Sequence, residues 1–148
     1  MEIKRSHEQK IGYEEIAAML RKADLRPTRQ RMALANLLFG NGDRHVSAEA
    51  LHEEARAAGV PVSLATIYNT LHQFTDSGLL RAIAVDTSKT YFDTNTGDHH
   101  HFFIEATNQV VDMPEGFIRV DNLPEPPPGF EISRVDVIVR VRQRDRRR

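Results

Sequence analysis

Three of the seven histidines in this chain follow one another, His99, His100 and His101, and the chain contains no cysteine. An apolar run, residues 102–104, comes directly after them, so the imidazoles lie against a predicted core. In an extended chain His99 and His101 point to one face and His100 points to the other. Two imidazoles on one face are typical of a transition-metal site, and a His-rich polar turn is the alternative interpretation.

Charge is divided unevenly along the chain, although the net charge is only -1. Residues 21–31 hold five basic residues and one acidic residue, whereas residues 93–131 hold eight acidic residues and one basic residue. The first stretch suits phosphate groups and the second suits cations. No apolar run could span a bilayer and no apolar leader opens the sequence, so we expect a soluble cytoplasmic protein without membrane contact.

Apolar spacing predicts four helices in the first half of the chain. Thr28, Ser47 and Ser63 are the predicted N-caps of the last three, and Gly59 is the predicted left-handed residue after the third. The predicted buried positions are Tyr13, Ile16, Ala17, Leu20, Met32, Ala35, Leu38, Phe39, Leu51, Ala55, Ala58, Leu64, Ile67, Leu71 and Phe74. Two strands, residues 79–85 and 90–93, follow as a hairpin. Helices followed by a hairpin predict a winged helix-turn-helix.

The pattern of apolar and polar residues changes after residue 94. Apolar patches surround Phe102 and Val110, a proline-rich connector covers residues 124–129, and residues 135–142 alternate as one half-buried strand,. About fifty residues are too few for a secure independent core, so we expect this part to pair with a second copy. The predicted fold class is α+β: an N-terminal winged helix-turn-helix domain (residues 1–94), a hinge (95–98) and a small C-terminal α/β dimerisation domain (99–148).

The fourth predicted helix presents an uncharged face opposite its apolar stripe. This face carries small, hydroxyl or amide side chains: Ala65, Thr66, Asn69, Thr70 and Gln73. Such side chains fit a DNA groove, where amides can pair with adenine, and Lys22, Arg29 and Arg31 would hold phosphates. An ordinary exposed helix surface is the alternative. Tyr68, at the edge of the stripe, suits either core packing or contact with a base.

Three strings occur in order, LRPTRQR at residues 25–31, HVSAE at 45–49 and SLATIYNTL at 63–71. With the histidine run and residues 91–93 they resemble the ferric uptake regulator family over about residues 13–113, and within it the iron response regulator of alpha-proteobacteria. The resemblance implies a winged-helix DNA-binding domain in which Tyr68 contacts thymine edges. Asn69 stands where arginine is common, so the operator preference is expected to differ. The predicted DNA-binding set is Lys22, Arg29, Arg31, Ser63, Ala65, Thr66, Tyr68, Asn69 and Gln73.

The resemblance also implies a regulatory metal site with ligands from both domains. The matching positions are His45, Asp93, His99, His101 and Asp112. Mixed imidazole and carboxylate ligands suit Mn, Fe or Zn. The family's cysteine-ligated structural zinc has no counterpart, because Ile104 and Thr107 occupy its positions. The iron response regulator branch senses haem, which makes His99, His100 and His101 candidate haem ligands and residues 99–148 a metal- and haem-sensing domain.

These features predict an iron- and haem-responsive transcriptional regulator that binds A/T-rich palindromic operators in double-stranded DNA as a homodimer. A repressor that responds to Mn or Zn without sensing haem is the alternative. A metal-dependent hydrolase built on His99, His101 and an aspartate, with Glu105 as the base, is remote, because no nucleophile motif or substrate loop accompanies it. A metal or haem store would leave the face of the fourth helix unexplained.

Overall fold

The computed structural model describes residues 11–86 and 89–145. The sequence start, residues 1–10, and residues 87–88 of the predicted hairpin turn lie outside the described residues. The chain divides into two compact units, Met1–Thr96 and Gly97–Arg148. Within the described ranges, no helix is both long and apolar enough to cross a membrane.

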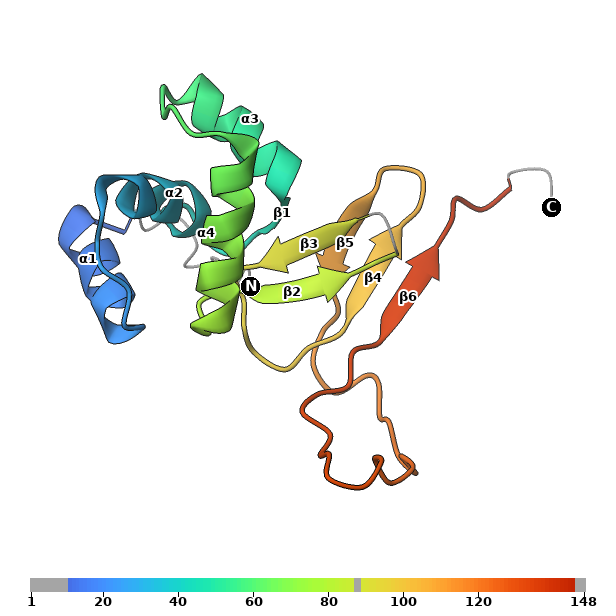
Figure 1. Cartoon of the computed structure of the whole chain (residues 1–148). Coiled ribbons are helices and arrows are strands. Elements are labelled where there is room, and N and C mark those ends of the chain that lie inside the picture. Colours follow the sequence, from blue (N-terminus) through green and yellow to red (C-terminus); the bar gives the residue numbers. More distant parts are fainter. Residues whose placement is uncertain (1–10, 87–88, 146–148) are drawn as a thin grey trace, which may run out of the picture. The chain divides into compact units, whose positions relative to one another are not determined.

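Four helices make up most of the first unit (Figure 1): α1 (Tyr13–Lys22), α2 (Arg29–Phe39), α3 (Ala48–Ala57) and α4 (Leu64–Asp76). The predicted caps are confirmed: the hydroxyls of Thr28, Ser47 and Ser63 accept from backbone N–H groups at 3.3, 3.2 and 3.1 Å. Each hydroxyl satisfies a donor that the helix leaves unpaired. Gly59, just beyond α3, has the predicted positive φ of 74°,.

A three-stranded antiparallel sheet completes the first unit. It contains β1 (His45–Ser47), β2 (Arg81–Ala84) and β3 (Thr90–Asp93) in the order β1-β3-β2. The hairpin of β2 and β3 was predicted, whereas β1 was missed because three residues carry no readable periodicity. Ser47 both ends β1 and caps α3, so this strand leads directly into that helix.

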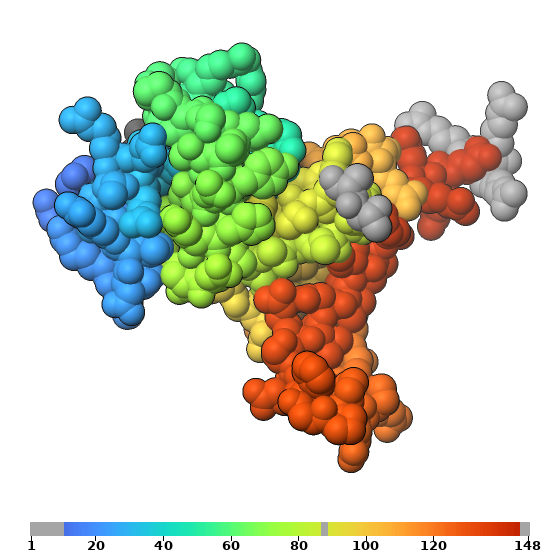
Figure 2. Space-filling view, viewed as in Figure 1, coloured from blue at the N-terminus to red at the C-terminus, as the bar shows by residue number. Residues whose placement is uncertain are grey.

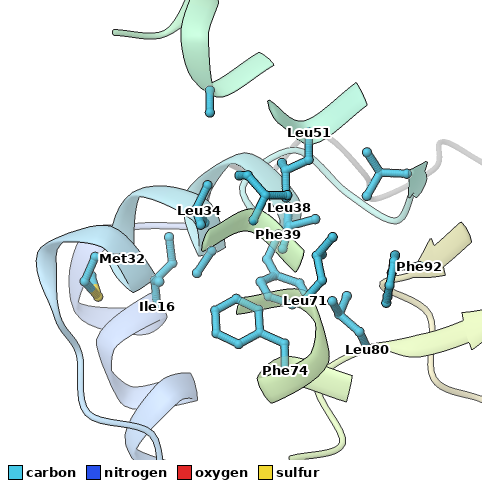
Figure 3. Close-up of a cluster of buried hydrophobic side chains, with 14 of the residues drawn as sticks. Ile16, Met32, Leu34, Leu38, Phe39, Leu51, Leu71, Phe74, Leu80 and Phe92 are labelled. Carbon is cyan, nitrogen blue, oxygen red and sulfur yellow. The ribbon is translucent and has the colours of Figure 1, made fainter. Parts of the chain in front are cut away.

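The core of the first unit lies between the four helices and β3. Figure 3 shows side chains from every one of these elements meeting, among them Ile16, Leu38, Leu51 and Phe92. Phe74 of α4 is fully buried, and its ring centroid lies 6.2 Å from that of Phe39 in α2. This packing fixes the position of α4, the helix with the uncharged face.

Four predicted positions on the helix faces were wrong. Tyr13 and Leu64 are 69% and 37% exposed, and Ala58 is exposed as well. Each lies at a helix end, Tyr13 and Leu64 as first residues and Ala58 just after α3, where less of the neighbouring structure covers it. Thr70, predicted to face DNA, is buried, because it lies one turn before Phe74 and shares its side of α4,.

The second unit is β-rich. It contains β4 (His101–Ile104), β5 (Gln109–Asp112) and β6 (Ile138–Val141) in the order β5-β4-β6. β4 pairs antiparallel with β5 and parallel with β6. The connection from β5 to β6 stands away from the sheet as a long loop (Figure 1). Helices in the first unit and strands in the second confirm the α+β class, although residues 97–145 hold no helix of the predicted α/β arrangement.

The two faces of the second sheet differ in chemistry. One face carries His101 and Phe103 of β4 beside Asp112 and Val110 of β5. Phe103 is buried there, with the Arg140 guanidinium 5.2 Å from its ring centroid. The opposite face is apolar except for Gln109 and is only partly covered; it carries Phe102, Ile104, Val111, Val139 and Val141.

The buried contact of Phe74 predicts a large loss of stability in Phe74→Ala. Removing the ring leaves a cavity between α2 and α4, so we expect the free energy of unfolding to fall by about 3–5 kcal/mol, measured by urea denaturation followed by circular dichroism. Tyr13→Ala removes a mostly exposed ring and is the control, expected within about 0.5 kcal/mol of the wild type. Equal losses in both variants would contradict this description of the core.

Candidate metal centre and DNA-facing helix

The first unit holds a histidine–aspartate pair across two strands. His45 of β1 lies directly opposite Asp93 of β3, and its Nε2 is 3.1 Å from Asp93 Oδ2. Asp93 is fully buried, and its other oxygen, Oδ1, accepts from the backbone N–H of Asn95 at 2.9 Å. Arg81 of β2 occupies the register position on the other side of Asp93. The pairing of three strands therefore presents one imidazole nitrogen and one carboxylate oxygen together.

The second unit brings two imidazoles to one carboxylate oxygen. Asp112 Oδ1 lies 3.0 Å from His99 Nε2 and 3.3 Å from His101 Nε2. The two rings are 4.5 Å apart, edge to face, and both histidines are buried, with 8% and 1% of their surface exposed. The strand register explains the arrangement, because His101 pairs with Asp112 across β4 and β5.

The hydrogen bond of His99 Nδ1 limits how His99 Nε2 can interact with Asp112. Its Nδ1 lies 2.7 Å from the carbonyl oxygen of Gly97, and a carbonyl only accepts, so Nδ1 carries the proton,. Nε2 then either holds a second proton or turns a lone pair toward the Asp112 oxygen. Two facing lone pairs repel, so a cation, either a proton or a metal ion, is needed between them. A metal-binding histidine commonly donates its second N–H to a carbonyl in this way.

The distances between donor atoms match those of ligands that share one ion. Atoms about 2.1 Å from a metal, at angles between about 90° and 109°, are about 3.0–3.4 Å apart. The His45–Asp93 pair and both histidine contacts of Asp112 fall within that interval. Imidazole nitrogens and carboxylate oxygens are ligands that Mn, Fe and Zn accept. The residues of each unit therefore fit a divalent metal by chemistry and by spacing.

His100 is separated from its neighbours, as strand alternation predicts. Its Nδ1 accepts from the backbone N–H of Val137 at 3.1 Å, and its carbonyl accepts from Met113 at 2.8 Å. Because Nδ1 uses its lone pair, the neutral ring carries its proton on Nε2. His100 thus joins β4 to the chain entering β6.

The outer side of α4 carries most of the predicted DNA-binding residues and is open in Figure 2. Ser63, Ala65, Tyr68, Asn69 and Gln73 are exposed and Thr66 is half-buried. The Ser63 and Thr66 hydroxyls lie 3.0 Å apart, so the cap also orients the threonine. Lys22 at the end of α1 and Arg29 at the start of α2 are exposed cations.

Arg31, predicted as a phosphate ligand, has two protein partners. Its guanidinium donates to the Arg26 carbonyl at 3.0 Å and to the Gln73 side-chain oxygen at 3.2 Å. These bonds connect α4 with α2 and the turn before it, so Gln73 presents its NH2 group outward and its oxygen to Arg31.

Tyr68 is held by α3. Its hydroxyl donates to Glu49 Oε1 at 2.5 Å, and 37% of the residue is exposed. This hydrogen bond is the main cause that lowers the pKa of the Glu49 carboxyl, and the Glu49 backbone amide acts in the same direction. Burial opposes both, and the positive charge of Lys89 adds the smallest effect, which also lowers the pKa. The same bond raises the pKa of the Tyr68 phenol, as do burial and the charge of Glu49. A neutral phenol thus donates to an ionised carboxylate.

Comparison with known proteins identifies the family. Residues 22–138 match the ferric uptake regulator family. The chain belongs to this family. The peroxide-responsive repressor PerR of Staphylococcus epidermidis is 35% identical over 100 residues, which cover 68% of this chain and 66% of PerR, just under two thirds of that relative. PerR of Staphylococcus aureus is 34% identical over 100 residues, 68% of this chain and 67% of that protein.

Solved structures agree with this assignment. The ferric uptake regulator of Pseudomonas aeruginosa, solved with manganese, is 27% identical with a TM-score of 0.67, and the match covers 88% of this chain and 98% of that one. The Vibrio cholerae regulator, at 20% identity and the same TM-score over 86% and 98% of the two chains, supports the fold alone. These relatives are named as a repressor and as uptake regulators, and the family to which this chain belongs is one of transcriptional regulators rather than enzymes. Metal-responsive regulation of transcription is the function at family level, and the iron response regulator branch stays a prediction.

Sequence reasoning missed the contacts that position these side chains. Glu49, in the first turn of α3, looks like a residue that merely complements the helix dipole, and nothing in its spacing from Tyr68 indicates their bond. The link from Arg31 to Gln73 was likewise invisible, because it joins two helices that are far apart in sequence.

The bond to Glu49 predicts an elevated titration midpoint for Tyr68. Ultraviolet absorbance of the wild type minus that of Tyr68→Phe isolates this phenol, and we expect its midpoint above the usual value of about 10. In Glu49→Gln the midpoint should fall toward that value, since the negative acceptor is gone, and Glu53→Gln on the same helix should leave it unchanged. A midpoint that is the same with Glu49 and with Gln at this position would rule out the bond.

Proposed function

We propose that this chain is a dimeric repressor whose binding to operator DNA is controlled by one divalent metal ion per chain, held by His45, Asp93, His99, His101 and Asp112. The observation that carries the proposal is that the Nε2 atoms of His99 and His101 both approach one oxygen of Asp112. The Nδ1 atom of His99 is bonded to the carbonyl oxygen of Gly97. That arrangement calls for a cation.

Covalent connection makes a shared ion feasible. Asp93 ends β3 and His99 is six residues further on, so the connecting chain spans at most about 20 Å even when fully extended,. Neither the pair in the first unit nor the triad in the second completes the coordination of Mn or Fe, whereas the five ligands together come close to six-fold coordination. An ion that uses both sets would restrict the angle between the two units, and that restriction is the proposed switch.

The proposed DNA contacts centre on α4. Tyr68, Asn69 and Ala65 would meet base edges in the major groove, while Lys22 and Arg29 would meet phosphates. The structure supports this assignment through the exposed, uncharged outer side of α4 and the caps that hold its first turn. We infer an A/T-rich palindromic operator of double-stranded DNA, which matches a regulator with two-fold symmetry.

Homodimer formation is proposed through the second unit. One face of its sheet is apolar and partly open, and several large apolar side chains of the loop between β5 and β6 are exposed, including Phe117 at 78% and Phe130 at 74%. A second copy would cover this surface, which a unit of about fifty residues has too little core to cover by itself.

Haem sensing was also predicted, and the hydrogen bond of His100 restricts how this residue could bind haem iron. Binding iron through Nε2 would require the ring proton to move to Nδ1, where Val137 already donates. Haem ligation by His100 would therefore break the bond between β4 and the chain leading into β6. For this reason we favour control by a metal ion over control by haem.

Metal titration separates one shared ion from two independent sites. Calorimetry with Mn(II) on the full chain should give one ion per chain, and His45→Ala and His99→Ala should each weaken that same site by more than about 100-fold, because each removes a ligand. His100→Ala is the matched control and should bind as the wild type does. Two ions per chain, with each variant losing a different one, would contradict the shared site.

Tyr68→Ala and Lys22→Ala should differ in how they weaken DNA binding. With a duplex selected from a random library by the Mn(II)-loaded protein, Tyr68→Ala should lose affinity for that duplex but not for a scrambled one. Lys22→Ala should weaken both and reduce the salt slope by about 1, since it contacts phosphate. Equal losses on both duplexes for Tyr68→Ala, or no selected sequence at all, would overturn the proposed reading helix.

A further inference from the structure

We infer that Glu49 is a specificity-determining positioning residue: it holds the Tyr68 hydroxyl in one orientation, so that the tyrosine meets DNA as a hydrogen-bond acceptor. The inference rests on the proposed function, in which Tyr68 faces the groove. It concerns a residue of α3 that is outside the predicted DNA-binding set.

Contacts on two sides immobilise the Tyr68 ring. Its hydroxyl is bonded to Glu49 at 2.5 Å, and its face stacks on His72 with ring centroids 6.5 Å apart and planes inclined by 24°. His72 in turn meets the buried Phe92 edge-on at 6.0 Å. Contacts from α3, from α4 itself and, through His72, from β3 therefore restrict both the ring and its hydroxyl, although the residue is 37% exposed.

The direction of the Tyr68 hydrogen bond determines which bases its hydroxyl can recognise. A phenol has one proton to donate and two lone pairs to accept with. Because the proton is committed to Glu49, the oxygen can only accept from a base. In the major groove the available donors are the amino groups of adenine and cytosine, while guanine and thymine present acceptors at the same edge. A free hydroxyl could rotate and accommodate either kind of base.

The charge of Glu49 argues against a role in affinity. A carboxylate beside a helix that faces DNA repels the phosphates of any duplex. Removing the charge should therefore strengthen binding to any duplex, whereas removing the hydrogen bond should weaken discrimination. Tighter binding together with weaker discrimination would therefore distinguish a positioning role of Glu49 from a purely electrostatic one.

The experiment measures the ratio of dissociation constants for scrambled and selected duplexes with the Mn(II)-loaded full chain. We expect Glu49→Ala to lower this ratio about tenfold, the value of one hydrogen bond to a charged group, while binding the scrambled duplex more tightly than the wild type. Glu49→Gln keeps an acceptor oxygen and should retain a ratio within about threefold of the wild type. Glu53→Ala, an exposed glutamate one turn further along α3, is the matched control and should leave the ratio unchanged,.

A double-variant cycle completes the test. Tyr68→Phe should lower the ratio as Glu49→Ala does, and the two changes together should cost no more than either alone, because they remove the same bond. Additive losses, or a ratio in Glu49→Ala equal to that of Glu53→Ala, would overturn the inference while leaving the proposed function intact. If the wild type selects no sequence, the proposed function fails and this inference fails with it.

Discussion

The pairing of β1 with β3 is the constraint on which the first unit depends. It sets His45 opposite Asp93, and it ends at Ser47, whose hydroxyl caps α3. Glu49 lies in the first turn of that helix and is bonded to Tyr68 of α4. This strand of three residues thus determines the position of His45, a proposed metal ligand, and the start of α3, the helix that holds Tyr68. Any change in the β1 register would displace both.

Electrostatics explains why the ligands are grouped as they are. A buried carboxylate such as Asp93 is costly unless hydrogen bonds or a cation compensate it, and the Asn95 amide and His45 both face it,. In the second unit the sharing of one Asp112 oxygen by two imidazoles raises the same requirement. A divalent ion would satisfy both sets of donors. Strand register thus arranges both sets of donor atoms in advance, and a bound divalent ion would add positive charge beside the two carboxylates.

Local sequence signals predicted most of the fold and the donor types but not the contacts between elements. Hydroxyl caps, a left-handed glycine and apolar spacing depend on neighbouring residues, which is why Thr28, Ser63 and Gly59 were predicted correctly. Burial at helix ends depends on what packs against them, so those predictions failed, whereas the burial of Thr70 follows from its one-turn spacing from Phe74,. The bond between Glu49 and Tyr68 joins two helices and carries no spacing signal. The metal ligands came from family resemblance, while alternation alone separated His100 from its neighbours.

The proposed switch depends on one ion that uses ligands from both units. X-ray absorption spectroscopy of the Zn(II)-loaded full chain tests it most directly, because multiple scattering from imidazole counts the histidines bound to the metal. We expect one zinc per chain bound by three imidazoles, with oxygen as the remaining ligands and all ligand atoms at about 2.0–2.2 Å. A spectrum with two imidazoles that His45→Ala leaves unchanged would contradict it.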